Sequence, residues 1–108
     1  MEKKIKIAVP AIHANLDENK RFKSELQEAF SGAEEVYLDF QNLAAISSIT
    51  LGCIMFGMRD HRTKIRFINT SDYLMDSLRT IIGKMVEEFV VGPVKKLEIE
   101  TFKSPSSR

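Results

Sequence analysis

Two adjacent hydroxyl side chains, Ser47 and Ser48, are the residues of this chain for which a chemistry is easiest to name. They follow a short apolar strand and a polar turn, and they precede a run of apolar residues with helical spacing. A helix N-terminus offers unpaired backbone N–H groups and about half a positive charge. A phosphate on either serine would be stabilised there, and an unmodified serine would serve as a helix cap. The pair is therefore a phosphoacceptor or a cap, with Thr50 as a further candidate acceptor.

Other residues that could take part in chemistry are few and widely spaced. Asp39 ends the apolar strand before the serines, and open α/β sheets place their sites at the carboxyl ends of such strands. Its carboxylate could orient the serine loop or accept from nearby backbone amides. Cys53, His13 and His61 are too scattered for a zinc site, and no base is placed to activate the thiol. We therefore expect a non-enzymatic protein without a metal or a cofactor.

The composition is that of an ordinary globular domain and argues against two classes of partner. Among 108 residues, 44% are hydrophobic and 29% are charged, and the formal charge of +1 gives no basic footprint for nucleic acid. No apolar run approaches the roughly 18 to 20 residues that cross a bilayer. A single cysteine excludes an internal disulfide and fits a cytoplasmic location. We expect one domain over residues 1–102 and a polar tail over 103–108.

Hydrophobic periodicity predicts an alternation of strands and helices. A segment at 12–16 reads as a second short strand or as a bend, and Asp17 reads as the cap of the first helix. Such an order implies an α/β fold, with a mostly parallel sheet of four to five strands covered by three to four helices. The expected strands are residues 4–9, 36–40, 65–68 and a last one through Leu97, Ile99 and Thr101.

The predicted helices each show an apolar face at helical spacing. The buried faces that this spacing gives are Phe22, Leu26, Ala29 and Phe30; Leu51, Ile54, Met55 and Met58; and Leu74, Met75, Leu78, Ile81 and Ile82. Asn69-Thr70-Ser71 is expected to cap the third helix, and Met85, Val86, Phe89 and Val90 suggest a further short helical turn. The four internal methionines are interpreted as core filler. Gly52 and Gly57 suit a helix that lies close to a sheet.

Several phrases, in this order, resemble the STAS domain, the fold of anti-sigma factor antagonists and of the cytoplasmic tails of sulfate transporters. The phrases are LDEN at 16–19, VYLDF at 36–40, AISSITLG at 45–52, IRFINT at 65–70 and the segment 78–89. They resemble, in turn, the start of the family's first helix, its central strand with an acid, its "FIDSSGLG" signature, its next strand and the segment after it. The resemblance covers about residues 5–100 and implies one STAS-like domain.

The resemblance also implies a regulatory role. In the phosphorylated members of the family, the serine after the signature aspartate accepts phosphate from a partner kinase that doubles as an anti-sigma factor; by position, this serine is Ser48. The chain departs from the signature, because Ser47 replaces the aspartate, Ile49 the next serine and Thr50 the glycine. These departures predict a partner that differs from the standard anti-sigma kinases, or a scaffold use in a larger assembly.

Two functions from different classes follow. The first is a regulatory module that docks a protein partner, a Ser/Thr kinase or an anti-sigma-type factor, through residues 44–58, with homo-oligomerisation left open. The second is a sensor of a small anionic ligand, nucleotide or lipid head group, or a transporter-accessory subunit. The first predicts exposed apolar residues around Ile49, and the second a concave polar pocket beside Asp39 and Ser48. For the first, the expected partner-binding residues are Gln41, Asn42, Ile49, Arg59 and Asp72.

Overall fold

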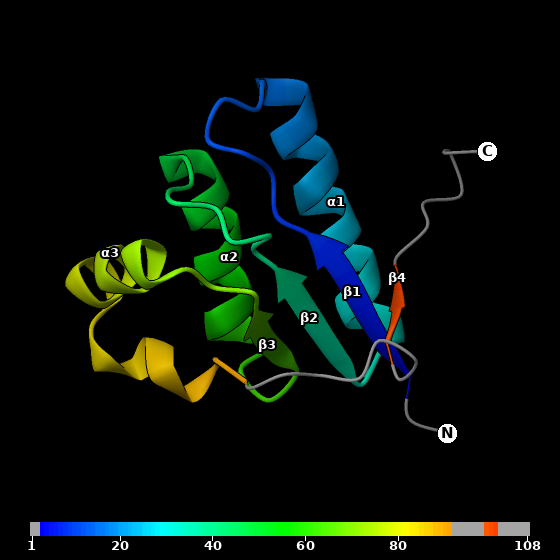
Figure 1. Cartoon of the computed structure of the whole chain (residues 1–108). Coiled ribbons are helices and arrows are strands. Elements are labelled where there is room, and N and C mark those ends of the chain that lie inside the picture. The colour runs from blue at the N-terminus through cyan, green and yellow to red at the C-terminus, as the bar shows by residue number, and fades with distance from the viewer. Residues whose placement is uncertain (1–2, 92–98, 102–108) are drawn as a thin grey trace.

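The computed structural model describes residues 3–91 and 99–101, and within them the chain forms an α/β fold (Figure 1). Strands and helices alternate along the chain, as hydrophobic periodicity predicts. The elements are β1 (Lys4–Ala8), α1 (Leu16–Gly32), β2 (Glu35–Asp39), α2 (Ser48–Asp60), β3 (Ile65–Ile68), α3 (Asp72–Ile82), a short 3-10 helix η1 (Lys84–Glu88) and β4 (Glu100–Thr101). The α/β class is therefore confirmed.

The sheet is parallel at every pairing between the described strands, in the order β3-β2-β1-β4. Val36 lies at its centre, aligned with Ile5 of β1 and with Ile65 of β3. Within the described residues, three strands have four or five residues and β4 has only two, so the sheet reaches the lower end of the predicted four to five strands only through β4. Three α-helices accompany them, at the lower end of the expected range.

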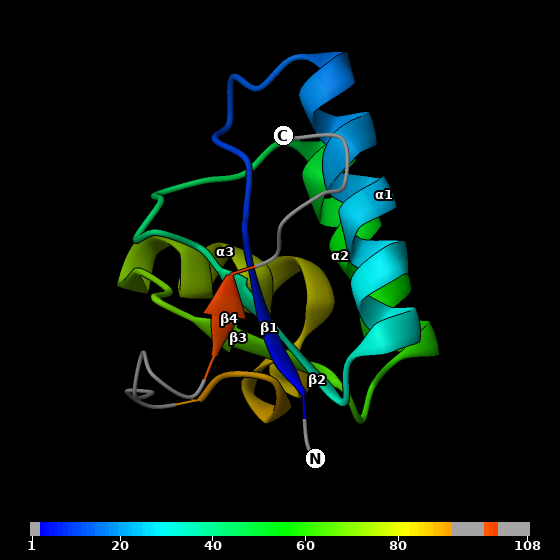
Figure 2. The same ribbon diagram turned by 90° about the vertical axis from the view of Figure 1, so that its right-hand side faces the viewer.

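The hydrophobic core lies against one face of the sheet. Alternate residues of the strands are buried there, and α1 and α2 cover them side by side (Figure 2). α3 and η1 lie at the β3 end, where backbone bonds link Phe67 to Phe89 and Val91. Burial of these side chains gives the main favourable free energy of the fold. The strand residues in this core are Ile5, Ile7, Val36, Leu38, Ile65 and Phe67.

The first helix begins earlier than expected. Asn15, rather than Asp17, is its N-cap: its side chain accepts from the backbone N–H of Glu18 at 2.8 Å, and the Glu18 carboxylate accepts from the N–H of Asn15. This reciprocal capping box satisfies two backbone donors at once, so it outcompetes a start at Asp17. The segment 12–16 forms a turn and the beginning of α1, and the alternative of a second strand there is wrong.

The second helix buries a face that is rotated from the predicted one. Its buried residues are Thr50, Ile54, Gly57 and Met58, whereas Met55 is 44% exposed and Leu51 is half-buried. Gly57 explains the rotation, because a Cβ there would lie 3.0 Å from the Phe30 ring and 3.1 Å from Ile65. The helix turns its glycine to the sheet, and Met55 moves outward. Met85, also taken as core filler, is 38% exposed.

The third helix follows its prediction at the start and departs from it at the end. Ser71 is the N-cap, with its side-chain oxygen accepting from the N–H of Leu74 at 3.1 Å. Ile81, expected to point inward, is 60% exposed, and the predicted short helical turn is η1.

Leu97 and the tail 103–108 lie outside the described residues. Within those residues, no helix combines the length and apolar character needed to cross a bilayer.

Candidate functional site

The two serines have different places at the start of α2. Ser47 is the N-cap, because its Oγ accepts from the backbone N–H of Thr50 at 3.1 Å. Ser48 is the first helical residue and is exposed. The capping alternative therefore applies to Ser47 and is wrong for Ser48. A group attached to Ser48 would lie beside the helix N-terminus without displacing the cap.

Thr50 holds the start of α2 against α1. Its buried hydroxyl donates to Oδ1 of Asn19 at 2.5 Å, and it lies 2.9 Å from the Oγ of Ser47. Since the one hydroxyl proton of Thr50 goes to Asn19, Ser47 is the donor in the second contact. The Asn19 amide in turn donates to the carbonyls of Ala14 and Asn15. Each member of this chain of bonds is satisfied, and the Thr50 oxygen is enclosed.

Asp39 organises the loop edge of the sheet. Its Oδ1 accepts from the backbone N–H of Gln41 and from the Asn69 side-chain amide, each at 2.9 Å. Gln41, Asn42 and Asn69 all have positive φ, of 52°, 57° and 54°. L-residues avoid this region, although asparagine tolerates it best. The carboxylate thus joins two loops whose backbones need support, and these two hydrogen bonds are made to the loops rather than to the serines.

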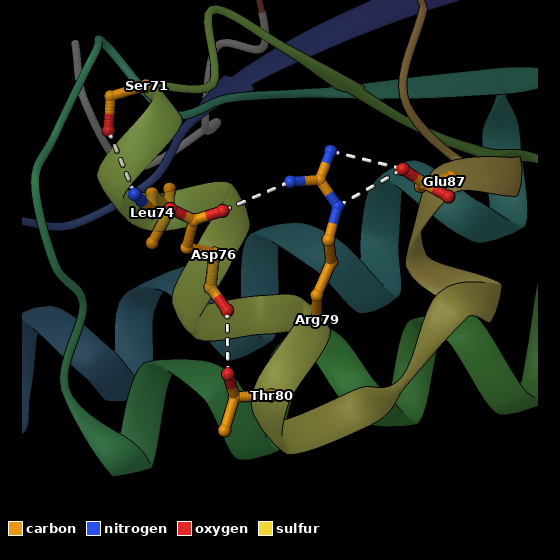
Figure 3. Close-up of polar contacts among 6 residues, drawn as sticks. All are labelled: Ser71, Leu74, Asp76, Arg79, Thr80 and Glu87. Carbon is orange, nitrogen blue, oxygen red and sulfur yellow. Dashed lines mark hydrogen bonds and ion pairs between the residues drawn. The ribbon is translucent and has the colours of Figure 1, made fainter.

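The corner between α3 and η1 is fixed by polar contacts around Arg79 (Figure 3). The guanidinium reaches Asp76 on its own helix at 3.2 Å and Glu87 of η1 at 3.1 Å. At the other end of α3, the Ser71 hydroxyl also donates to the carbonyl of Leu43 at 2.7 Å. These contacts tie α3 to η1 and to the loop that leads to the serines.

The outward side of α2 is apolar. We call Ile49, Gly52, Met55 and Phe56 the outer face of α2; Ile49 is 53% exposed and Phe56 is 56% exposed. A Cβ built on Gly52 would meet nothing within 4 Å, so the middle of this face is open. Large apolar side chains gathered at a surface are typical of sites that contact another molecule.

Two grooves flank the outer face. The first, of about 410 Å³, lies between α1 and α2 and contains Ile49, Cys53 and Phe56. The second, of about 540 Å³, lies between α2 and the corner of α3 and η1. Neither groove is lined by Asp39 or Ser48. The residues lining the second groove are Gly52, Met55, Phe56, Met58, Arg59, Arg62, Ile82 and Met85.

The residues expected to bind a partner are not gathered at one place. Ile49 lines the first groove and Arg59 the second. Gln41 lines a separate polar hollow of about 230 Å³ beside the end of β1, and Asn42 and Asp72 are exposed at the loop edge and in the first turn of α3.

Four residues that form the grooves are missing from the named partner-binding residues, although two of them, Met55 and Phe56, lie within the predicted docking segment 44–58. Met55, Phe56, Ile82 and Met85 were assigned to the core or passed over. One signal pointed to Met55 and Phe56: the segment 48–60 is apolar on more than one side, which a helix with a single buried face does not need.

Cys53 and His61 both border the first groove. Burial raises the pKa of the Cys53 thiol above its usual range, so the thiolate is disfavoured at neutral pH. The His61 ring stacks on Phe30, with centroids 4.2 Å apart, at the C-cap of α2. Over the part of the chain that the structure describes, no group of three or more His, Cys, Asp or Glu side chains is placed to hold a metal ion.

Comparison of the chain with models of protein families, with curated proteins and with solved structures gives no significant match. The STAS resemblance therefore depends on the sequence phrases and on the order of the elements.

Proposed function

We propose that this chain is a non-enzymatic, cytoplasmic regulatory module of the STAS type that docks a protein partner through residues 44–58. The observation that carries the proposal is the exposed outer face of α2, directly after the serine pair. The partner class is a Ser/Thr kinase or an anti-sigma-type factor. A small-ligand sensor would need a polar concavity beside Asp39 and Ser48, and the grooves next to α2 are apolar instead.

Ser48 is the proposed switch. Its side chain is exposed one residue before Ile49, so a phosphate there would place about −1.5 to −2 charges beside the docking face. Modification of Ser47 would instead disrupt its cap and its bond to Thr50. The Thr50 hydroxyl is enclosed between two helices. This difference in exposure ranks Ser48 above the other two candidate acceptors.

A site-specific photo-crosslink tests the docking face. A photoreactive phenylalanine analogue replaces Ile49 in the full chain, expressed in its native cells, and the matched control carries it at Ser24. Ser24 is exposed on α1 and lines neither groove. We expect a discrete crosslinked protein from position 49 and none from position 24. Identical patterns from the two positions would refute docking through α2.

The switch is tested in the same cells by phosphopeptide mass spectrometry, and by adding Ser48→Glu or Ser48→Ala to the crosslinking chain. We expect phosphate on Ser48 under some growth or stress conditions, and a crosslink reduced by the glutamate but kept by the alanine. Absence of phosphate in every condition would leave the docking module and remove the switch.

A further inference from the structure

We infer that the second groove, between α2 and the corner of α3 and η1, receives an amphipathic helix whose apolar side is bordered by acidic residues. The inference rests on the proposed function, because it names the kind of partner that the docking face would take. The first observation is the lining, whose apolar part consists of methionine, phenylalanine and isoleucine around an open glycine. Helices commonly bind in grooves of this kind.

Methionines make the groove adaptable. Met55 of α2 and Met85 of η1 are partly exposed, and Met58, which also lines the groove, is buried and belongs to the core. Unbranched thioether side chains fit differently shaped apolar anchors, which suits a surface that receives leucine or isoleucine side chains. The corner that carries Met85 is also where Arg79 contacts both Asp76 and Glu87 (Figure 3). The adaptability of the groove therefore lies in its methionine side chains.

The charged side chains at the groove favour a partner with negative charge. Both charged side chains that line it are arginines, Arg59 and Arg62. Each guanidinium lies over an aromatic ring, Arg59 at 4.7 Å from the centroid of Phe56 and Arg62 at 6.0 Å from that of Phe89. Contact with a ring face leaves N–H groups at the edge of the guanidinium for carboxylates.

The acids already beside these arginines do not cancel this preference. Arg59 pairs with Asp60 at 3.0 Å, and Arg62 pairs with Glu88. All four side chains are at least half exposed, and solvent screening leaves exposed pairs of this kind weak, so a partner carboxylate can join or replace them. Neither Asp60 nor Glu88 lines the groove.

A second copy of this chain is a poorer occupant than an acidic helix. A symmetric dimer through the second groove would place the arginines of one copy against those of the other, because both subunits use the same surface. Like charges brought together in an interface oppose association. The groove therefore favours a different chain with the opposite charge.

Methionine methyl NMR of the full chain with synthetic peptides tests this inference. The probe is a peptide of about 18 residues, long enough to form a helix on contact, with leucines at i, i+3, i+4 and i+7 and glutamates beside them. Its twin has lysine in place of every glutamate. Met55, Met58 and Met85 line the groove, and buried Met75 does not, so it serves as the internal control.

We expect the acidic peptide to shift the methyl signals of the three groove methionines and not that of Met75. It should bind at least roughly tenfold more tightly than the lysine twin, a difference of about 1.4 kcal/mol. Phe56→Ser should weaken binding, whereas Tyr73→Ser, at an exposed aromatic that does not line the groove, should not. Arg59→Glu with Arg62→Glu should reverse the preference, and Lys20→Glu with Arg21→Glu should not.

Equal affinity for the two peptides, or no shift with either, would overturn the inference. The same shifts on self-association, or with anionic phospholipid vesicles and not with the peptide, would assign the groove to a second copy or to a membrane surface and would also overturn it. A crosslink from position 49 together with a negative peptide result would keep the proposed docking function and reject only the acidic helix. Absence of a specific crosslink from position 49 in the chain with unmodified Ser48 would reject the docking function itself.

Discussion

The Thr50 hydroxyl donates to Oδ1 of Asn19 at 2.5 Å, and this bond joins the first turn of α2 to that of α1. Both residues are buried, with Asn19 3% exposed and Thr50 0% exposed. This buried bond therefore holds the first turn of α2, which carries the serine pair, against α1. A position so fixed can present Ile49 and Ser48 in a constant orientation.

Replacing Thr50 with valine should destabilise the fold. The change keeps the shape but leaves Oδ1 of Asn19 buried without its donor, which costs about 1–3 kcal/mol. Thr80→Val is the control, because the hydroxyl of Thr80 bonds to Asp76 at the surface. Urea unfolding measures both free energies. Adding Asn19→Leu to Thr50→Val should cost less than the sum of the single changes, since both bonding partners are then removed; simple additivity would show that the bond does not couple the helices.

Replacement of the two serines by alanine should lower the free energy of unfolding by different amounts in the same urea assay. Ser47→Ala removes the N-cap of α2 and should lower the free energy of unfolding by about 1 kcal/mol. Ser48→Ala changes an exposed helical position and should stay within about 0.5 kcal/mol of the wild type. Equal losses from the two changes would mean that Ser48 contributes to capping.

The two glycines of α2 should respond to alanine with opposite signs. Gly57→Ala would push a methyl group against Phe30, whose ring is held by its stack on His61, and such overpacking costs about 1–3 kcal/mol. Gly52→Ala meets open space and should gain up to about 1 kcal/mol through helix propensity. Thermal and urea unfolding of the two variants make the comparison. A stabilised Gly57→Ala variant would contradict the packing of α2 described above.

Glu25 should give a small pH dependence of stability. Burial raises the pKa of this carboxyl above its ordinary value, partly opposed by Arg21 and reinforced by Glu28. A raised pKa in the folded state means that ionisation of Glu25 destabilises the fold. The stability that protonated Glu25 contributes is therefore lost as pH rises through the folded pKa. Glu25→Gln should therefore be more stable than the wild type at pH 7 and equal to it near pH 3. Exposed Glu34→Gln is the control, and an advantage that grows toward acid would contradict the prediction.

The sequence by itself determined the order of elements, the capping of α3 from within Asn69-Thr70-Ser71 and the place of the serine pair. These depend on local chemistry: alternation in Lys4–Ala8, helical spacing from Phe22 to Phe30, and hydroxyl side chains before an apolar run. Even the capping box missed at Asn15 is a local pattern, an asparagine followed three residues later by a glutamate.

Tertiary structure alone decided which side of α2 is buried and which residues form the grooves. Periodicity placed Met55 inward with Ile54, because both are apolar and adjacent on one helical stripe. The close approach of Gly57 to Phe30 and Ile65 turned the helix and left Met55 outside. Burial of this kind is set by contacts between segments far apart in the chain, and local spacing does not encode those contacts. The grooves arise in the same way, since their walls come from helices that meet only in the folded molecule.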